Sequence, residues 1–412
     1  MTLIQPFKGL RPTREKAQDV SAPPYDVVSK KEAKELAQDK PYSFLHVSRP
    51  EIDLPDEIDP YSDEVYGQGK KKLEEMIAEG LLVRDQSPAY YLYQIQDGAH
   101  IQTGLVAVAS AEKYDQNLIV KHELTRAVKE KDRICMIDTM NAQASPVLLA
   151  CPPSEEFRKL GSEITKASPD LAVKDERGVD HRLWVVAQAA QIDQLNRIFN
   201  QGFEKIYIAD GHHRSAAGSR VAALRKEANP NHSGSEGYNY FLSVIFPADE
   251  MKILDYNRAV TDLNGLSADE LLKALEGSFL VTPQDGAYKP PRPAEMGMFL
   301  EGKWYRLEVK KEKIPQDPTQ SLDVTLLYDQ CLKPILGIGN PRTDKRIDFI
   351  GGIRGLAELE KRVRAGEFAV AFAMHPTKME QIMAVADAGE IMPPKSTWFE
   401  PKLVDGLITH LL

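Results

Sequence analysis

The segment Ile206–Arg214 limits the possible folds of this chain more than any other feature. It reads Ile-Tyr-Ile-Ala-Asp-Gly-His-His-Arg. The residues from Glu204 to Ala209 favour a strand, and those from His213 to Glu227 repeat apolar side chains with a period of about 3.6, as an amphipathic helix does. Only a tight turn at Gly211 separates the two patterns. The sequence therefore predicts a buried strand that delivers Asp210 into a cleft and passes directly into a helix.

The residues of this turn are suited to binding an anion. The first N–H groups of a helix have no partner inside it, and the helix dipole is positive at this end. His212, His213 and Arg214 add further donors, and the forked guanidinium of arginine matches phosphate. Cations in the first turn oppose the dipole, and a bound anion would remove that conflict. The alternative is that Asp210 only caps the helix and that the histidines lie on the surface.

A second polar cluster lies in the segment Lys121–Ile134, for which we expect a helix. His122, Arg126, Lys129 and Arg133 are spaced by three or four residues, so on a helix they would share one face and could contact phosphates. Glu123 is an additional carboxylate in the same segment. A solvated face balanced by acidic residues is the alternative for this pattern.

Two loops carry further candidate residues. Near the start of the chain, Asp26 follows a rigid pair of prolines, and near the end Lys395, Ser396 and Thr397 precede Trp398. Either loop could be a simple turn. If all these segments serve one site, we expect them to line one pocket although they are far apart in sequence.

Composition excludes several classes of protein. A net charge of −9 does not suit a protein that covers nucleic acid, because phosphate contacts need clustered cations. The three cysteines, Cys135, Cys151 and Cys331, are scattered, so neither a disulfide framework nor a thiolate zinc site is expected. No apolar run reaches the ~20 residues of a spanning helix. We therefore expect a cytoplasmic protein without a nucleic-acid or membrane partner.

The order of the predicted elements indicates the fold class. Strands and helices alternate irregularly and are interrupted by hairpins, which favours an α+β (mixed α/β) fold over a regular doubly wound sheet. Neither a Walker loop nor a Gly-x-Gly-x-x-Gly turn after a strand is present. We predict two regions, residues 1–250 and residues 251–412, and we expect the last loop of the second to return to the active site.

Several motifs together resemble the domain-of-unknown-function family 1015 over nearly the whole chain. The motifs that carry the resemblance are Pro23–Val27, Lys121–Glu123, Lys129 with Asp132–Arg133, Ala209–Arg214, Asn257–Arg258 and Met392–Lys402. That family is similar to the ParB/sulfiredoxin-like superfamily. The resemblance implies a ParB/sulfiredoxin-like catalytic core, in which the box at Gly211–Arg214 binds nucleotide phosphates, followed by an additional C-terminal α/β region.

The resemblance also implies an activity. Relatives in the superfamily, the free serine kinases, phosphorylate free L-serine, so we expect a small-molecule phosphotransferase that uses ATP, ADP or pyrophosphate with Mg²⁺. Their catalytic carboxylate lies in an N-terminal segment, and the candidates here are Asp26 and Glu123. Asp210 is a third candidate for the group that accepts the proton or holds the metal. The donor phosphate would contact Arg214 and His213, with Lys129, Arg133 and Lys395 as possible supplements.

Two other functions remain open from the sequence. One is a nucleotide-binding switch without catalysis, as in ParB proteins, which would need a DNA-binding partner domain. The other is a metal-dependent hydrolase that uses Asp210, His212 and His213, because imidazole and carboxylate bind several metals. The acceptor, the metal ligands and the oligomeric state are not indicated by any pattern.

Overall fold

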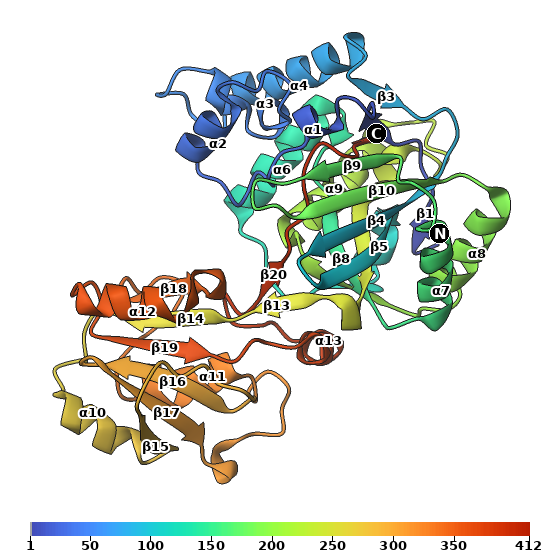
Figure 1. Ribbon diagram of the computed structural model, residues 1–412. Helices are drawn as coiled ribbons and strands as arrows, with labels where there is room; N and C mark the ends of the chain where they lie inside the picture. Colours follow the sequence, from blue (N-terminus) through green and yellow to red (C-terminus); the bar gives the residue numbers. More distant parts are fainter. Residues whose placement is uncertain (1) are drawn as a thin grey trace. The chain divides into compact units, whose positions relative to one another are not determined.

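A computed structural model gives the positions of residues 2–412, which fall into two compact units (Figure 1). The first comprises Met1–Met251 together with Pro401–Leu412, and the second comprises Lys252–Glu400. The end of the chain therefore belongs to the first unit, where β21 pairs with β7. Each unit has its own sheets and is described by itself.

The first unit is built around a mixed sheet with the strand order β6-β11-β8-β12-β5-β4-β10-β9, to which β1 adds by pairing with β5. Only the β6–β11 and β8–β12 pairs are parallel. The strands of this unit are β1 (Ile4–Gln5), β2 (Leu10–Pro12), β3 (Leu82–Arg84), β4 (Tyr90–Asp97), β5 (His100–Ser110), β6 (Ile119–Val120), β7 (Ala142–Gln143), β8 (Val147–Cys151), β9 (Leu171–Lys174), β10 (Asp180–Val186), β11 (Ile206–Asp210), β12 (Tyr240–Pro247) and β21 (His410–Leu411).

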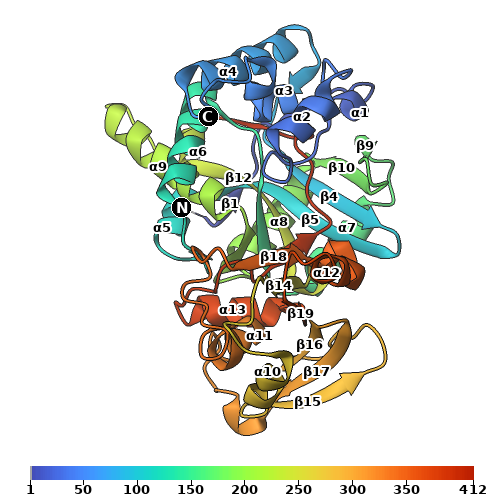
Figure 2. The same cartoon turned by 90° about the vertical axis from the view of Figure 1, so that its left-hand side faces the viewer.

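The helices of the first unit lie around this sheet, and α6 and α9 pack side by side (Figure 2). They are α1 (Ala17–Val20), α2 (Lys30–Ala37), α3 (Leu45–Ser48), α4 (Asp63–Ala78), α5 (Ala111–Asp115), α6 (Ala127–Met140), α7 (Glu155–Ile164), α8 (Ala189–Asn200) and α9 (His212–Ala228). One apolar core joins the sheet to α7 and α8, and another joins α3 and α4 to α6. Burial of these apolar faces stabilises the layers.

The predicted strand–turn–helix is confirmed. β11 is buried from Ile206 to Ala209, and α9 begins two residues after the strand ends. Gly211 has φ 95°, a left-handed conformation that glycine adopts without the steric cost of a Cβ atom. β4 and β5 form a hairpin that turns at Asp97-Gly98. Pattern reasoning succeeds here because β-formers fill the strands and glycine marks each turn.

The helix expected over Lys121–Ile134 is wrong in its first part. β6 ends at Val120, and α6 begins only at Ala127, so His122 and Arg126 precede the helix. The reason is tertiary. β6 pairs with β11, and the Arg126 N–H donates to Nε2 of His213, so the backbone of residues 121–126 is held by contacts outside its own segment. A helix through these residues would lose those contacts.

The second unit contains a six-stranded antiparallel sheet with the order β15-β17-β16-β19-β14-β18, and a separate β13–β20 ribbon. Its strands are β13 (Lys252–Leu254), β14 (Tyr256–Val260), β15 (Phe279–Gln284), β16 (Glu295–Leu300), β17 (Lys303–Val309), β18 (Ile347–Gly351), β19 (Val370–Met374) and β20 (Trp398–Glu400). Its helices are α10 (Ala268–Leu275), α11 (Asp323–Leu327), which continues as a π-helix (Tyr328–Leu332), α12 (Gly355–Arg364) and α13 (Met379–Asp387). Ser267 and Glu270 form a capping box at the start of α10.

Together the two units make this a mixed α/β protein, as the sequence predicts. Among residues 2–412, no helix combines the length and the apolar character that crossing a bilayer requires.

Candidate functional site

The turn between β11 and α9 places Asp210 and Arg214 close together. The pairing of β11 with β8 shifts register between Ile208 and Asp210, and such an irregularity re-aims the side chains beside it. The Gly211 N–H donates to Oδ1 of Asp210 at 2.8 Å, and Nη2 of Arg214 lies 4.0 Å from the same oxygen. The register shift and the left-handed glycine thus fix the strand's last carboxylate against the first turn of the helix.

A lysine from the end of the chain completes the environment of this carboxylate. Nζ of Lys402 lies 3.1 Å from Oδ2 of Asp210. Burial disfavours the charged form of Asp210, but Lys402 and Arg214 outweigh it and hold the pKa of this carboxyl below its usual range. Asp210 is therefore ionised at neutral pH, with its side chain 38% exposed and able to meet a ligand.

Arg214 is the most enclosed cation of the cluster, with 10% of its side chain exposed. Nη1 donates to the carbonyl oxygen of Pro146, and Nη2 lies 3.5 Å from Oδ2 of Asp26. Nε is buried and has no hydrogen-bond partner among residues 2–412. Burial works against the charge, but Asp26 and then other acidic neighbours raise the pKa of Arg214. The guanidinium is thus permanently charged and has donor capacity to spare.

Asp405 is fully buried, and the charges of Arg214 and Asp26 act on its carboxyl. Its Oδ2 accepts from the Ser145 hydroxyl at 2.8 Å and from the Tyr25 N–H at 3.3 Å. Burial raises the pKa of Asp405 to about 7, against the lowering effects of Ser145 and Arg214. Asp405 therefore changes its charge near neutral pH and fixes the loop that carries Asp26.

Three histidines surround the start of α9. The His122 N–H donates to Nε2 of His212 at 3.5 Å, and their rings meet edge to face at 4.5 Å. Burial lowers the pKa of His122 to about 4, and burial together with His122 lowers the pKa of His212. Burial and the charge of Arg126 lower the pKa of His213 as well. The buried pair is neutral at pH 7, and Nδ1 of His122 is enclosed without a partner in the described part of the chain.

The remaining candidate residues of the first unit are Glu123, Arg133 and Lys129. Oε2 of Glu123 is 3.9 Å from Nδ1 of His212. Arg133 pairs with Asp132 at 2.8 Å and stacks over the Tyr25 ring, 4.1 Å from its centroid. Lys129 is exposed, faces the Tyr61 ring at 5.7 Å, and lowers the pKa of His213 through its charge. The structure thus brings the segments around Asp26, His122 and Arg214 together.

Lys395, Ser396 and Thr397 belong to the second unit, and the expectation that they join this site stays a prediction. Within that unit the carbonyl oxygen of Lys395 accepts from Nη2 of Arg258 at 3.0 Å. The Ser396 hydroxyl donates to the carbonyl oxygen of Pro393 at 2.7 Å. Lys395 has φ 56°, which is uncommon for a residue other than glycine, asparagine or aspartate.

Sequence reasoning missed two residues of the cluster, Lys402 and Asp405. Lys402 stands in a motif recognised near the end of the chain, but nothing in its spacing connects it with Asp210. Asp405 carries no local pattern at all, because an acidic residue in a short apolar stretch looks like an ordinary loop residue. Both belong to the terminal segment that returns to the first unit.

A cavity of about 40 Å³ lies beside Arg214, Arg133, Tyr25 and Ser145. This volume suits about three water molecules and is too small for a substrate. A ligand of the cluster would therefore meet Asp210 and Asp26 from their exposed side. Among residues 2–412, no group of three or more histidine, cysteine or acidic side chains is arranged to hold a metal ion.

These features define a mixed α/β protein whose first unit carries a strand–turn–helix with a buried arginine between two carboxylates. The chain belongs to the family described as protein of unknown function (DUF1015), whose model matches residues 4–325. A search of curated proteins finds no match.

Several solved structures are similar to this chain at low identity. A free serine kinase in complex with AMP is 16% identical, with 71% of this chain and 86% of that chain covered and a TM-score of 0.34. A conserved hypothetical protein from Pyrococcus furiosus is 16% identical, with 73% and 94% covered and a TM-score of 0.34. SbnI from Staphylococcus aureus is 11% identical, with 73% and 85% covered and a TM-score of 0.38. At these scores the matches carry no argument about function, which has to come from the site.

Proposed function

We propose that this protein is a small-molecule phosphotransferase, a kinase of a free amino acid such as L-serine that takes its phosphate from ATP, ADP or pyrophosphate. The observation that carries the proposal is Arg214, a buried guanidinium in the first turn of α9 with an unpartnered Nε and a carboxylate on either side. Buried polar groups normally have partners, so a missing one points to a ligand or to water. Phosphoryl transfer asks a protein mainly for positioning and charge neutralisation, and this cluster offers both.

The charge states of the residues assign a role to each of them in this proposal. Arg214 and the first N–H groups of α9 hold the donor phosphate. His213 accepts the Arg126 N–H at Nε2, so in its neutral form Nδ1 carries the proton and can donate to a phosphate oxygen. Asp210, kept ionised by Lys402, takes the proton of the acceptor hydroxyl. Asp26 and Glu123 are the other candidates for that base.

Mg²⁺ fits this site only with help from the ligand. Magnesium in phosphoryl-transfer sites is commonly held by one or two carboxylates together with substrate phosphates. Asp210 or Asp26 would supply the carboxylate here. The donor phosphates would supply oxygen ligands that do not come from the protein. The ion would neutralise charge on the transferred group.

The test is to incubate the full chain with Mg²⁺, a panel of free amino acids and ATP, ADP or pyrophosphate, and to follow transfer by ³¹P NMR. The proposal expects one phosphorylated amino acid to appear, and expects the Asp210→Asn variant to bind nucleotide but lose turnover. Wild-type protein that binds nucleotide and phosphorylates nothing in the panel would instead support a nucleotide switch without catalysis. Failure to bind any of the three donors would overturn the phosphate site itself.

A further inference from the structure

The second unit contains a cavity of about 530 Å³ that the proposed function does not use. Its walls come from α11 and the π-helix that follows it, from the loop at Gly339–Pro341, from strands β14 and β18, and from Pro393 and Pro394. Small-molecule sites typically have volumes of about 300–1,000 Å³. The cavity is therefore large enough for a small organic ligand.

Arg258 supplies a buried positive charge to this cavity. It lies on β14 with 3% of its surface exposed, and it donates to the carbonyl oxygens of Tyr256 and Lys395. Burial lowers the pKa of Arg258 to about 9, so it remains cationic at neutral pH. Its guanidinium carbon also lies 5.4 Å from the centre of the Phe349 ring, but within residues 2–412 no carboxylate forms an ion pair with it, although buried charges are normally paired.

The rest of the lining suits an anion with an apolar body. Oγ1 of Thr325 is buried and has no hydrogen-bond partner in the described chain. Lys333 adds a second cation, and the cavity wall contains no acidic residue. The rings of Tyr328 and Phe349 and the two prolines form the apolar part of the wall. A guanidinium without a carboxylate partner, an unpartnered hydroxyl and apolar side chains thus belong to residues that line one cavity.

We infer that this cavity binds the oxyanion group of a small organic molecule, a phosphate ester or a carboxylate, through Arg258 and Thr325. The anion would supply the countercharge that the fold does not give to Arg258 and the partner that Thr325 lacks. The flat rings and prolines would contact the planar or apolar body of the same molecule. This site lies wholly within the second unit and does not depend on the phosphotransferase proposal.

The competing explanation is that Arg258 only fixes the loop at Lys395 through its hydrogen bond. The Thr325→Val variant separates the two explanations, because valine has nearly the shape of threonine without the hydroxyl. In an empty cavity, removal of an unpartnered buried hydroxyl leaves the melting temperature unchanged or raises it. If the hydroxyl binds a ligand, the same change weakens binding by roughly two- to tenfold.

The experiment is isothermal titration of the full chain with phenyl phosphate, benzoate and inorganic phosphate. It uses an Arg214→Ala background, so that the proposed site in the first unit does not contribute. We expect phenyl phosphate or benzoate to bind more tightly than inorganic phosphate, and which of the two binds identifies the oxyanion. Arg258→Lys should weaken that binding roughly tenfold or more, because a lysine cannot reproduce the planar fork.

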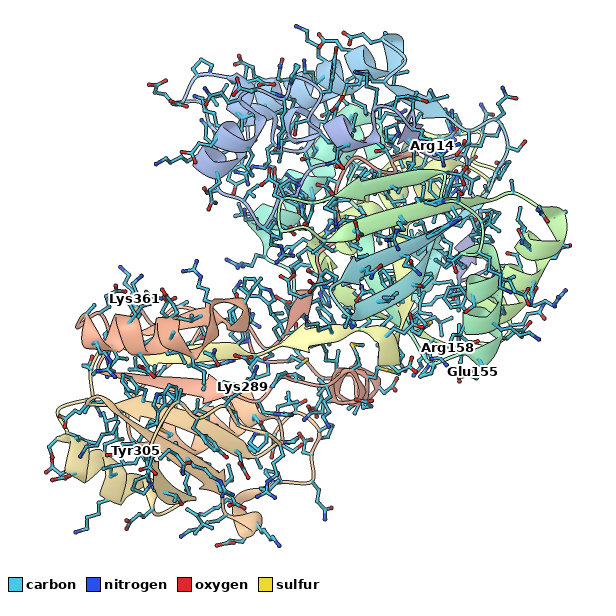
Figure 3. All side chains as sticks on the ribbon, viewed as in Figure 1. Arg14, Glu155, Arg158, Lys289, Tyr305 and Lys361 are labelled. Carbon is cyan, nitrogen blue, oxygen red and sulfur yellow. The ribbon has the colours of Figure 1, made fainter. Side chains whose placement is uncertain are left out.

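The matched control is Lys361→Ala, which removes a cation from α12 of the same unit outside the cavity wall (Figure 3). It should bind like the parent protein. If neither organic probe binds, or if Arg258→Lys and Thr325→Val both bind like the parent, the inference is wrong. Melting curves of each variant show whether a loss of binding reflects a loss of folding.

Discussion

Nζ of Lys402 lies 3.1 Å from Oδ2 of Asp210, although 192 residues separate them in the chain. Asp210 ends β11, the strand next to the edge strand β6 of the main sheet, whereas Lys402 follows the whole of the second unit. The charge of the candidate catalytic carboxylate therefore depends on a segment that is synthesised last. The second unit is an insertion between the strand that bears the carboxylate and the lysine that keeps it ionised.

Replacement of Lys402 by methionine should raise the pKa of Asp210. The lysine charge and hydrogen bond both favour the carboxylate form, so their loss makes protonation easier. If Asp210 is the base, activity appears only when it is ionised, and the acid limb of the pH–rate profile should move to higher pH. Lys402→Arg keeps the charge and should retain the original limb. Titration of the Asp210 carboxyl by NMR in both proteins measures the shift directly, and an equal pKa of Asp210 in the wild type and in the methionine variant would contradict the role of Lys402.

Replacement of Arg214 by alanine should weaken nucleotide binding by about 1.5–3 kcal/mol, or roughly ten- to a hundredfold, as expected for a lost hydrogen bond to a charged group. Calorimetric titration with ADP measures the effect. Arg220→Ala is the matched control, because Arg220 lies on the same helix with 69% of its side chain exposed. Equal affinities of the two variants would rule out Arg214 as the phosphate ligand.

Gly211→Ala tests the turn itself. The residue has φ 95°, and a Cβ there would lie 3.0 Å from Nε of Arg214. A left-handed backbone costs a non-glycine residue about 1–2 kcal/mol, and the close contact would also displace the guanidinium. Gly178 has φ 82° and open space where a Cβ would lie, so Gly178→Ala should show only the cost of the left-handed backbone. Thermal melts should show both variants destabilised, whereas only Gly211→Ala should lose ADP affinity.

Asp405→Asn should stabilise the protein more at pH 8 than at pH 5. Asp405 has a folded-state pKa of about 7, whereas an unfolded aspartate has one of about 3.9. Between these values the folded state keeps a proton that the unfolded state has lost, so the free energy of unfolding falls as pH rises. The free energy of unfolding falls by at most about 1.4 kcal/mol per pH unit, and asparagine, which does not titrate, does not cause this fall.

Melting temperatures of wild type and variant at pH 5 and pH 8 measure this effect. Asp39→Asn, at an exposed position, serves as the control and should show little difference between the two pH values. A gain for Asp405→Asn that is equal at both pH values would contradict the raised pKa.

The sequence predicted those elements whose side chains carry a regular period. The strand at Ile206–Asp210, the turn at Gly211 and the helix that follows could be identified because a short run of β-formers ends at a glycine and is followed by helix-forming residues. Sequence reasoning failed at residues 121–126, where the spacing of His122 and Arg126 with Lys129 and Arg133 was compatible with a helix. There the pairing of β6 with β11 and the contact of Arg126 with His213 outweigh local helix propensity.

The sequence by itself determined the local chemistry of this protein, namely the glycine turn, the histidines and the arginine at the start of one helix. Only the tertiary structure decided their charge states and their neighbours. Asp26, Lys402 and Asp405 come from opposite ends of the chain, and their distances to Arg214 and Asp210 are set by sheet pairing and by the return of the last segment to the first unit. Burial and the distances between charges depend on the tertiary structure, so no spacing along the chain reveals them.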